Sequence, residues 1–261
     1  MSQGGASSPK YKPPKGNAQE RRRRGQTLGS PVEQPDYVWK TAFGSTLNGN
    51  GKDEHINGVK ITNAEARALR KYTDSSHINM VLGKADGDLN SPIFSDAERE
   101  QVRNMDSAIK DFGWNKTETN TSFVRGAGAI TCGVPTNYMT PQEIVDYINT
   151  KRIGTKNVNV GYTSICRKSN VASSFSGNQK NPVVLEYRTI GKGMRGVFVS
   201  GGDGKAPISG FGTHENETLL QRNVVTVPVY AYLGSDGRPR VVVDAFPLKK
   251  GDTGWTTNKG I

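Results

Sequence analysis

Between residues 63 and 113 the hydrophobic positions repeat three or four residues apart, at the spacing of an amphipathic helix. The segment 63–82 has a polar break in its middle, and Asn63 is a suitable N-cap for it. The segment 95–113 starts with Ser95 and Glu98 at capping-box spacing and ends at Gly113. The apolar positions of these segments are Ala66, Leu69, Tyr72, Ile78, Leu82, Val102, Met105, Ile109 and Phe112. We therefore expect helices in both.

Beyond residue 120 the pattern changes to short apolar runs separated by Gly, Pro and Asn, which is typical of strands. The runs are SFVRGAG, NVGYTSIC, PVVLEYRTI, GVFVSG, LLQRNVVTVPVYAYLG and RPRVVVDAFPL. A further helix is expected in TPQEIVDYINT, with Thr140 at its cap and Pro141 in its first turn. Because helices come first and strands later, without regular alternation, the order predicts an α+β fold with mainly antiparallel sheet.

The amino-acid composition sets the N-terminal residues apart from the helices and strands expected in the rest of the chain. The 261-residue chain carries a net charge of +11, and residues 1–35 are rich in Pro, Lys and Arg, with the run Arg21 to Arg24 as the densest basic patch. We interpret residues 1–35 as a disordered basic arm that precedes a folded domain at 36–261. A solvated tail, a tether to RNA or a membrane surface, a docking arm and a delivery signal all fit this arm.

Two further features limit the class of protein. The two cysteines, Cys132 and Cys166, have no metal-type spacing, so free thiols are expected. The chain contains no apolar run long enough for a membrane-spanning helix, and its N-terminus lacks the apolar core of a secretory signal.

The tripeptide Glu215-Asn216-Glu217 follows a Gly-rich loop and precedes two leucines. At strand spacing both carboxylates point to the same face, where they repel each other. A metal site is disfavoured because the chain has three histidines and no second acidic cluster. A glycosidase normally takes its two carboxyls from separate segments. Stabilisation of an oxocarbenium ion and a solvated pair at a sheet edge remain as interpretations.

Two other segments carry polar groups at strand ends. Arg125 follows an apolar strand and precedes Gly126, so its guanidinium could clamp a phosphate beside open backbone. Tyr162, Thr163 and Ser164 place three hydroxyls on a strand, and Phe175 follows a polar loop. Each signal alone is also compatible with an ordinary surface arginine or with strand packing.

In their order along the chain these segments resemble the mono-ADP-ribosyltransferases of the bacterial-toxin class, whose core is Arg, Ser-Thr-Ser and Glu-x-Glu. ALRKYTDSSHINMVL resembles the helix signature of the family, with Tyr72 and Asn79 in the expected places. NPVVLEYRTIGKGMRGVFVSGG and ISGFGTHENETLL resemble its strand, turn, strand, loop and Glu-x-Glu strand. The similarity covers roughly residues 60–245. It implies two packed, mainly antiparallel sheets that form an NAD cleft, with N-terminal helices.

The resemblance implies NAD⁺ as substrate and a role for each matching residue. Arg125 would grip the phosphates, and the backbone of Gly126 would bind the nicotinamide amide. Glu217 would hold a ribose hydroxyl and stabilise the oxocarbenium ion. The other expected NAD⁺ contacts are Tyr72, Tyr162, Thr163, Phe175 and Arg167, with Thr163 and Ser164 also assigned to catalysis.

Glu215 would meet the acceptor, and in this family a Glu at that place goes with arginine as the target. The loop from Gly201 to His214 would recognise the target protein, with Phe211 and His214 as contacts. One departure is Tyr162, which stands where the family has the serine that orients the catalytic Glu. Thr163 or Ser164 would then take that role.

The leading hypothesis is thus an NAD⁺–protein-arginine ADP-ribosyltransferase, a secreted toxin, injected effector or phage protein that acts in the cytoplasm of a foreign cell. Its partner would be a target-cell protein with an accessible arginine. An NAD⁺ glycohydrolase, with water as acceptor, is one alternative. A basic nucleic-acid-binding module is another, although few aromatic residues accompany the basic patch to stack on bases.

Overall fold

The computed structural model describes residues 54–56, 59–75, 77–112, 123–135, 137–166, 169–190, 193–200, 208–209, 217–249 and 255–257. The basic arm predicted at 1–35 and the helix stop predicted at Gly113 lie outside these residues. Among the described residues, no helix has the length and apolar character needed to cross a bilayer. The same part of the chain contains no group of three or more metal-ligating side chains.

Three helices occupy the N-terminal part of the described chain: α3 (Asn63–Asp74), α4 (His77–Lys84) and α5 (Asp96–Phe112). The predicted cap Asn63 is wrong, because α3 is capped by Thr62. Thr62 exchanges two hydrogen bonds with Glu65, its Oγ1 accepting from the Glu65 N–H at 3.2 Å and its own N–H donating to the carboxylate at 2.8 Å. Asn63 as cap would have Ala66 at the reciprocal position, which offers no side-chain acceptor.

The other predicted caps are confirmed. Ser95 Oγ accepts from the Glu98 N–H at 3.3 Å, and Glu98 accepts from the Ser95 N–H at 2.8 Å. Helix α6 (Pro141–Tyr147) has Thr140 as its N-cap and Pro141 in its first turn, as expected, and continues as a π-helical turn over Ile148–Arg152.

The largest sheet has six strands in the order β11-β4-β9-β10-β6-β3. Their bounds are β3 (Phe123–Gly128), β4 (Lys156–Asn159), β6 (Pro182–Ile190), β9 (Val224–Leu233), β10 (Pro239–Pro247) and β11 (Trp255–Thr257). The pairs β10–β6 and β11–β4 are parallel, and the other neighbours are antiparallel. The sheet is therefore mixed but mainly antiparallel, as the strand-rich second half predicted.

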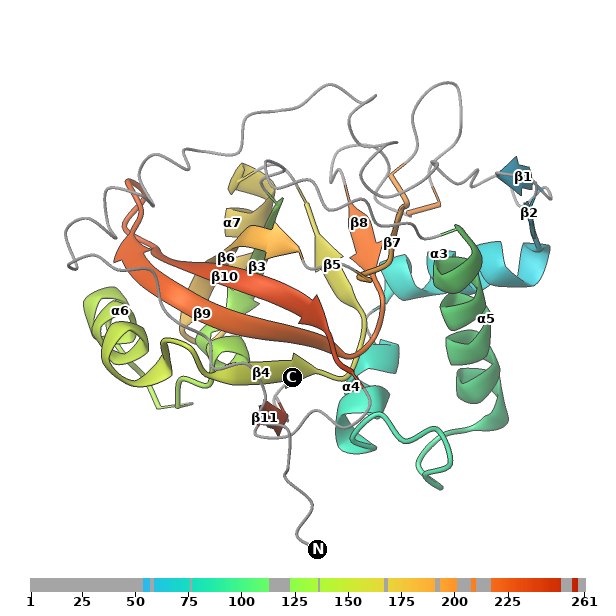
Figure 1. The fold of residues 1–261 in the computed structure, drawn as a ribbon, viewed down its shortest axis with the longest axis horizontal. Helices are drawn as coiled ribbons and strands as arrows, with labels where there is room; N and C mark the ends of the chain where they lie inside the picture. The colour runs from blue at the N-terminus through green and yellow to red at the C-terminus, as the bar shows by residue number, and fades with distance from the viewer. Residues whose placement is uncertain are drawn as a thin grey trace, which may run out of the picture.

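A second sheet has the order β5-β8-β7 and is antiparallel throughout. Its strands are β5 (Thr163–Ile165), β7 (Gly196–Phe198) and β8 (Thr218–Leu220). A short hairpin, β1 (Glu54–Ile56) with β2 (Val59–Ile61), precedes α3. Figure 1 shows α3, α4 and α5 gathered beside the three-stranded sheet, and α6 beside the far end of the six-stranded one.

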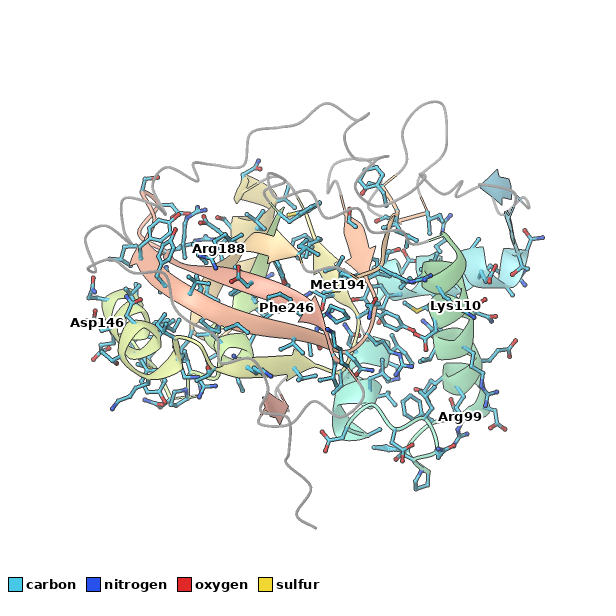
Figure 2. All side chains as sticks on the ribbon, in the orientation of Figure 1. Arg99, Lys110, Asp146, Arg188, Met194 and Phe246 are labelled. Atoms are coloured by element: carbon cyan, nitrogen blue, oxygen red, sulfur yellow. The ribbon has the colours of Figure 1, made fainter. Side chains whose placement is uncertain are left out.

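The hydrophobic core has two main parts. One lies between the six-stranded sheet and α6, and the other joins α3, α4 and α5 to the three-stranded sheet through Val197 and Leu219. Figure 2 shows the side chains that fill both parts, with Met194 in the first. Cys132 and Cys166 are both buried and neither forms a disulfide, as predicted.

In the described part of the chain, the two sheets meet at one backbone bridge. Val124 of β3 and Cys166, directly after β5, exchange two N–H···O=C bonds of 2.8 Å each. Helix α7 (Ser169–Gly177) follows and packs on β3. This junction brings the predicted Arg125 strand beside the predicted hydroxyl strand.

Candidate active site

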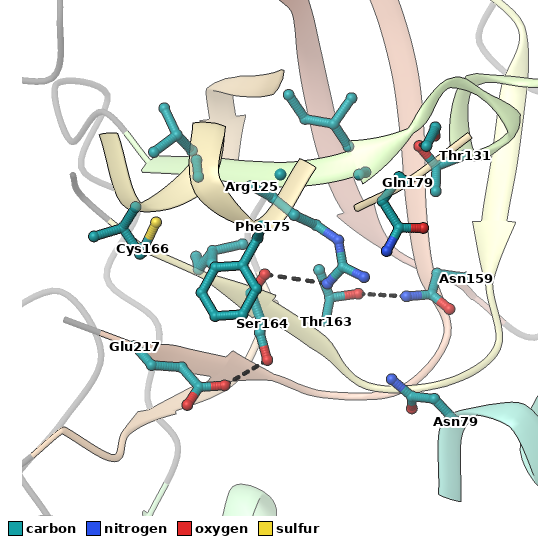
Figure 3. Close-up of a pocket in the computed structure, with 18 of the residues that line it drawn as sticks. Asn79, Arg125, Thr131, Asn159, Thr163, Ser164, Cys166, Phe175, Gln179 and Glu217 are labelled. Atoms are coloured by element: carbon teal, nitrogen blue, oxygen red, sulfur yellow. Dashed lines mark hydrogen bonds between the residues drawn. The ribbon is translucent and has the colours of Figure 1, made fainter. Parts of the chain in front are cut away.

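A pocket of about 410 Å³ opens at the junction of the two sheets. Its walls come from the end of α3, from β3, β5 and α7, and from Glu217 directly before β8. Pockets of this size are typical of sites for small molecules and cofactors. Figure 3 shows Arg125, Thr163, Ser164, Phe175 and Glu217 around this space. Five residues that the sequence singled out, on three segments, therefore share one pocket.

Arg125 is half-buried in β3, the edge strand of the six-stranded sheet that lies next to β5. Its Nη1 donates to the carbonyl oxygen of Ser164 at 3.1 Å. The adjacent bridge from Val124 to Cys166 fixes the distance between the two strands. Backbone geometry thus holds the guanidinium at the pocket, and an anion that enters the pocket would meet a positive charge.

Glu217 is the buried carboxylate of the pocket, with 8% of its surface exposed. Ser164 Oγ donates to its Oε1 at 2.5 Å. The backbone of Glu217 is fixed as well, because its N–H donates to Ser200 Oγ at 2.7 Å and its carbonyl accepts from the Val199 N–H at 3.1 Å. Among the neighbouring hydroxyls of Tyr162, Thr163 and Ser164, the one that bonds to this carboxylate is that of Ser164.

Behind Ser164 lies a buried group of polar side chains from the N-terminal helices. Asn79 Nδ2 donates to Tyr72 Oη at 3.0 Å, and Tyr72 Oη lies 3.5 Å from Ser164 Oγ. Burial raises the pKa of Tyr72, and the nearby charge of Arg125 only partly opposes this. The phenol therefore keeps its proton at neutral pH and can bond to the serine that holds Glu217.

Thr163 also lines the pocket and is almost fully buried. Its Oγ1 accepts from Asn159 Nδ2 at 2.8 Å, and Asn159 Oδ1 accepts from the Gly161 N–H at 3.1 Å. Asn159 was not predicted as a site residue from the sequence. The spacing Asn-x-Gly-x-Thr is the local signal that could have indicated it.

Tyr162 was predicted as a cofactor contact, but its side chain points away from the pocket. Its phenol Oη donates to Asp106 Oδ1 at 2.8 Å and to the Val102 carbonyl at 3.1 Å, both on α5. The residue is fully buried and does not belong to the pocket lining. A ring buried against α5 cannot reach a ligand in the pocket, so the structure offers no ligand contact for it.

Phe175 lies on α7 rather than after an irregular loop, and its side chain is 51% exposed at the pocket. Helix α7 approaches β3 so closely that a Cβ on Gly126 would lie 2.0 Å from the Ala172 carbonyl oxygen. Only glycine leaves room for this contact. Gly126 therefore lets the helix that carries Phe175 lie over the Arg125 strand.

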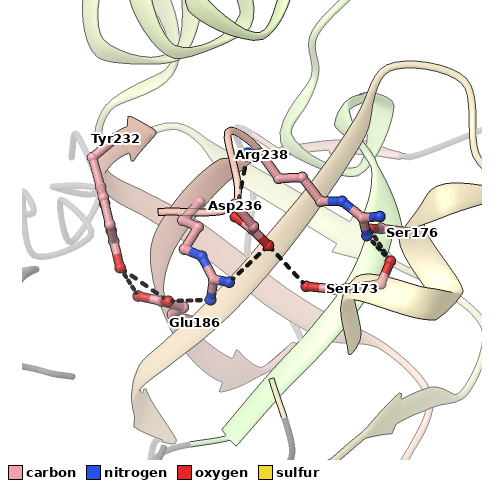
Figure 4. Close-up of polar contacts among 7 residues, drawn as sticks. Ser173, Ser176, Glu186, Tyr232, Asp236 and Arg238 are labelled. Carbon is pink, nitrogen blue, oxygen red and sulfur yellow. Dashed lines mark hydrogen bonds and ion pairs between the residues drawn. The ribbon is translucent and has the colours of Figure 1, made fainter. Parts of the chain in front are cut away.

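The turn between β9 and β10 holds the other side of α7 (Figure 4). Arg238 donates to the Ser173 carbonyl and, at 3.2 Å, to Ser176 Oγ. Asp236 accepts from Ser173 Oγ at 3.3 Å and pairs with Arg240 at 3.2 Å. Together these bonds tie α7 to the six-stranded sheet and stabilise the position of the pocket wall.

Four predicted site residues lie outside the described part of the chain. They are Arg167, Phe211, His214 and Glu215. Their roles stay predictions.

Comparisons with known proteins identify the family of the chain. The family model described as ADP-ribosyltransferase exoenzyme matches residues 41–250. No curated protein matches the chain in sequence.

Solved structures share the fold at low sequence identity. An ADP-ribosyltransferase from Clostridium botulinum has a TM-score of 0.56 and 16% identity, over 88% of this chain and 96% of that one. A C3 protein from S. aureus, solved with NAD, has a TM-score of 0.54 and 16% identity, over 89% and 97%. ADP-ribosyltransferase Vis, solved with agmatine, has a TM-score of 0.50 and 15% identity, over 94% and 92%.

The family match spans most of the chain and includes every described residue of the pocket. The pocket also joins the Arg strand, the hydroxyl strand and the Glu strand on which the resemblance rested. The chain belongs to the ADP-ribosyltransferase exoenzyme family.

Proposed function

We propose that this protein is a mono-ADP-ribosyltransferase that cleaves NAD⁺ and transfers ADP-ribose to an arginine of a target protein. The observation that carries the proposal is the hydrogen bond of 2.5 Å from Ser164 to Glu217, in the same pocket as the half-buried Arg125. The pocket thus combines an oriented carboxylate, which suits the positive charge that develops on the ribose, with a guanidinium, which suits the phosphates of NAD⁺. The NAD in the S. aureus structure of the same fold supports this substrate.

In this proposal the described residues divide the binding of NAD⁺ among them. Arg125 pairs with the phosphates, because a guanidinium can hold phosphate oxygens bidentately. The backbone of Gly126 bonds the nicotinamide amide, and Phe175 offers its exposed ring to the nicotinamide and ribose. Thr163 and Tyr72 line the wall near the reacting ribose. Arg167 is proposed as a second phosphate contact.

Glu217 carries the chemistry. As the bond between nicotinamide and ribose breaks, positive charge develops on the ribose, and a fixed carboxylate stabilises that charge more than it stabilises the ground state. The Ser164 hydroxyl holds this carboxylate in one orientation before the substrate arrives. The Ser200 hydroxyl and the Val199 amide hold the backbone beneath it.

We further propose that Glu215 orients the guanidinium of the acceptor arginine and helps to remove its proton. The support is the agmatine in the Vis structure, since agmatine carries the same guanidinium group as arginine. Phe211 and His214 are proposed to contact the target protein.

The protein acted on would belong to another cell, as the family description "exoenzyme" suggests. The enzyme would then be a toxin or effector that is secreted or injected and works in the target-cell cytoplasm. The basic residues 1–35 are proposed to serve delivery or docking.

The test is NAD⁺ consumption by the purified protein with agmatine as a small acceptor, followed by mass spectrometry of the product. We expect the wild type to form ADP-ribosyl-agmatine and Glu217→Gln to lose about 10²–10³-fold in kcat, as for other transition-state contacts. Glu100→Gln, on the exposed side of α5, is the matched control and should keep full activity.

Equal rates for the wild type and Glu217→Gln would refute the proposal. If NAD⁺ is cleaved but agmatine and arginine proteins stay unmodified, the enzyme is a glycohydrolase, and only the arginine assignment is wrong. Glu215→Gln should abolish modification of agmatine while NAD⁺ cleavage by water persists.

A further inference from the structure

One carboxylate outside the pocket is bound by two residues that flank β5 and β8, the strands that position Ser164 and Glu217. Asp106 on α5 is bound by Tyr162, which directly precedes β5, and by Arg222, which follows β8. We propose that Asp106 is a positioning residue, which sets the Ser164–Glu217 hydrogen bond by anchoring β5 and β8 to α5. This inference rests on the proposed function, because its role is to orient the carboxylate that cleaves NAD⁺.

The first contact reaches β5 through a buried tyrosine. Tyr162 Oη donates to Asp106 Oδ1 at 2.8 Å, and the backbone N–H of Tyr162 donates to Asn79 Oδ1 at 2.7 Å. Burial, followed by the charge of Asp106, raises the pKa of Tyr162 well above its ordinary value, so the phenol keeps the proton that it donates. Tyr162 is therefore fixed at both its ring and its backbone, two residues before Ser164.

The second contact reaches the end of β8. Arg222 Nε donates to Asp106 Oδ1 at 3.0 Å, and its Nη2 donates to Oδ2 at 2.5 Å. Such a fork of two parallel bonds fixes direction as well as distance. Arg222 Nη1 adds a bond of 3.5 Å to the Gly87 carbonyl, just after α4. The chain leaving β8 is thus held to the same carboxylate as the chain entering β5.

The consequence concerns the distance between Ser164 and Glu217. Strands β5 and β8 are antiparallel neighbours, with Ser164 opposite Leu219 and Ile165 opposite Thr218. Glu217 directly precedes β8, so a slide or tilt between these short strands would change the distance of 2.5 Å between Ser164 Oγ and Glu217 Oε1. Each strand has only three residues, so few ladder bonds resist such a movement. The Asp106 anchor supplies the missing restraint.

The test compares steady-state NAD⁺ cleavage by the full chain and by Asp106→Asn, at a temperature well below both unfolding midpoints. We expect Asp106→Asn to lower kcat between about tenfold and a hundredfold, with a change in KM below about threefold, since misplacement of the catalytic group affects the chemical step. Asp244→Asn is the matched control. It breaks another Arg–Asp fork, with Arg188 on β6, outside the pocket lining. It should lower the unfolding midpoint and keep kcat.

A double-variant cycle separates positioning from mere stability. If Asp106 acts through Ser164, then Asp106→Asn combined with Ser164→Ala should be no slower than Ser164→Ala alone. Additive losses, or a kcat loss no larger than that of Asp244→Asn, would overturn the inference. Should Asp106→Asn fail to fold, Tyr162→Phe removes the phenol contacts to Asp106 and to the Val102 carbonyl but keeps the Arg222 fork, and it is judged by the same cycle. A wild type without NAD⁺ turnover would instead refute the proposed function, and the inference with it.

Discussion

The hydrogen bond between Ser164 and Glu217 permits a quantitative prediction. Ser164→Ala removes the hydroxyl that donates to Glu217 Oε1 at 2.5 Å and leaves the backbone of β5 unchanged. Glu217 keeps its backbone bonds to Ser200 and Val199, so the carboxylate stays in the pocket without the hydroxyl that orients it. The variant thus tests the contribution of the Ser164 hydroxyl, which also lies 3.5 Å from Tyr72 Oη.

The expected loss follows from the kind of bond. A hydrogen bond to a charged group contributes about 1.5–3 kcal/mol. If the whole of this energy is used in the transition state, kcat falls between about tenfold and 150-fold, at about 1.4 kcal/mol for each factor of ten. KM for NAD⁺ should change much less, because Arg125 and Phe175 are unaffected.

The assay is the initial rate of nicotinamide release over a range of NAD⁺ concentrations. Thr155→Ala is the matched control, since it also removes a hydroxyl, which donates to the Arg152 carbonyl at 2.7 Å, but lies outside the pocket lining. Its kcat should equal that of the wild type. A kcat within about twofold of wild type in Ser164→Ala would show that the carboxylate needs no orienting hydroxyl, and the reasoning from the bond length would be wrong.

Two further predictions concern stability. Gly126→Ala places a Cβ 2.0 Å from the Ala172 carbonyl oxygen, so we expect a loss of about 1–3 kcal/mol from overpacking, seen as a lower melting temperature. An unchanged melting temperature would show that α7 can move away from β3. Hydrogen bonds from Ser95 lower the pKa of Glu98 from its ordinary 4.5 to about 2. Because the folded pKa is the lower one, this stabilisation is present above pH 4.5 and is lost as the pH falls towards 2. The difference in melting temperature between wild type and Ser95→Ala should shrink over that range, and a constant difference would contradict the assignment.

The sequence by itself determined the features that depend on neighbouring residues. The caps at Ser95 and Thr140 follow from reciprocal bonds within four residues, and the apolar periods located the helices and strands. The order of the Arg, hydroxyl and Glu strands was enough to indicate the family. Where the local prediction failed, at Asn63, a better pair of reciprocal bonds existed one residue earlier, between Thr62 and Glu65.

Only the tertiary structure decided which hydroxyl meets Glu217 and where Tyr162 points. The three residues Tyr162, Thr163 and Ser164 are alike as hydroxyl donors, and their directions depend on how β5 lies between β3, β8 and α5. The contact between Asp106 and Arg222 joins residues 116 positions apart, and no local pattern specifies such a pair. Local hydrogen bonds and hydrophobic periods are short-range and can be deduced from the sequence, whereas the catalytic arrangement depends on distant segments that meet only when the chain folds.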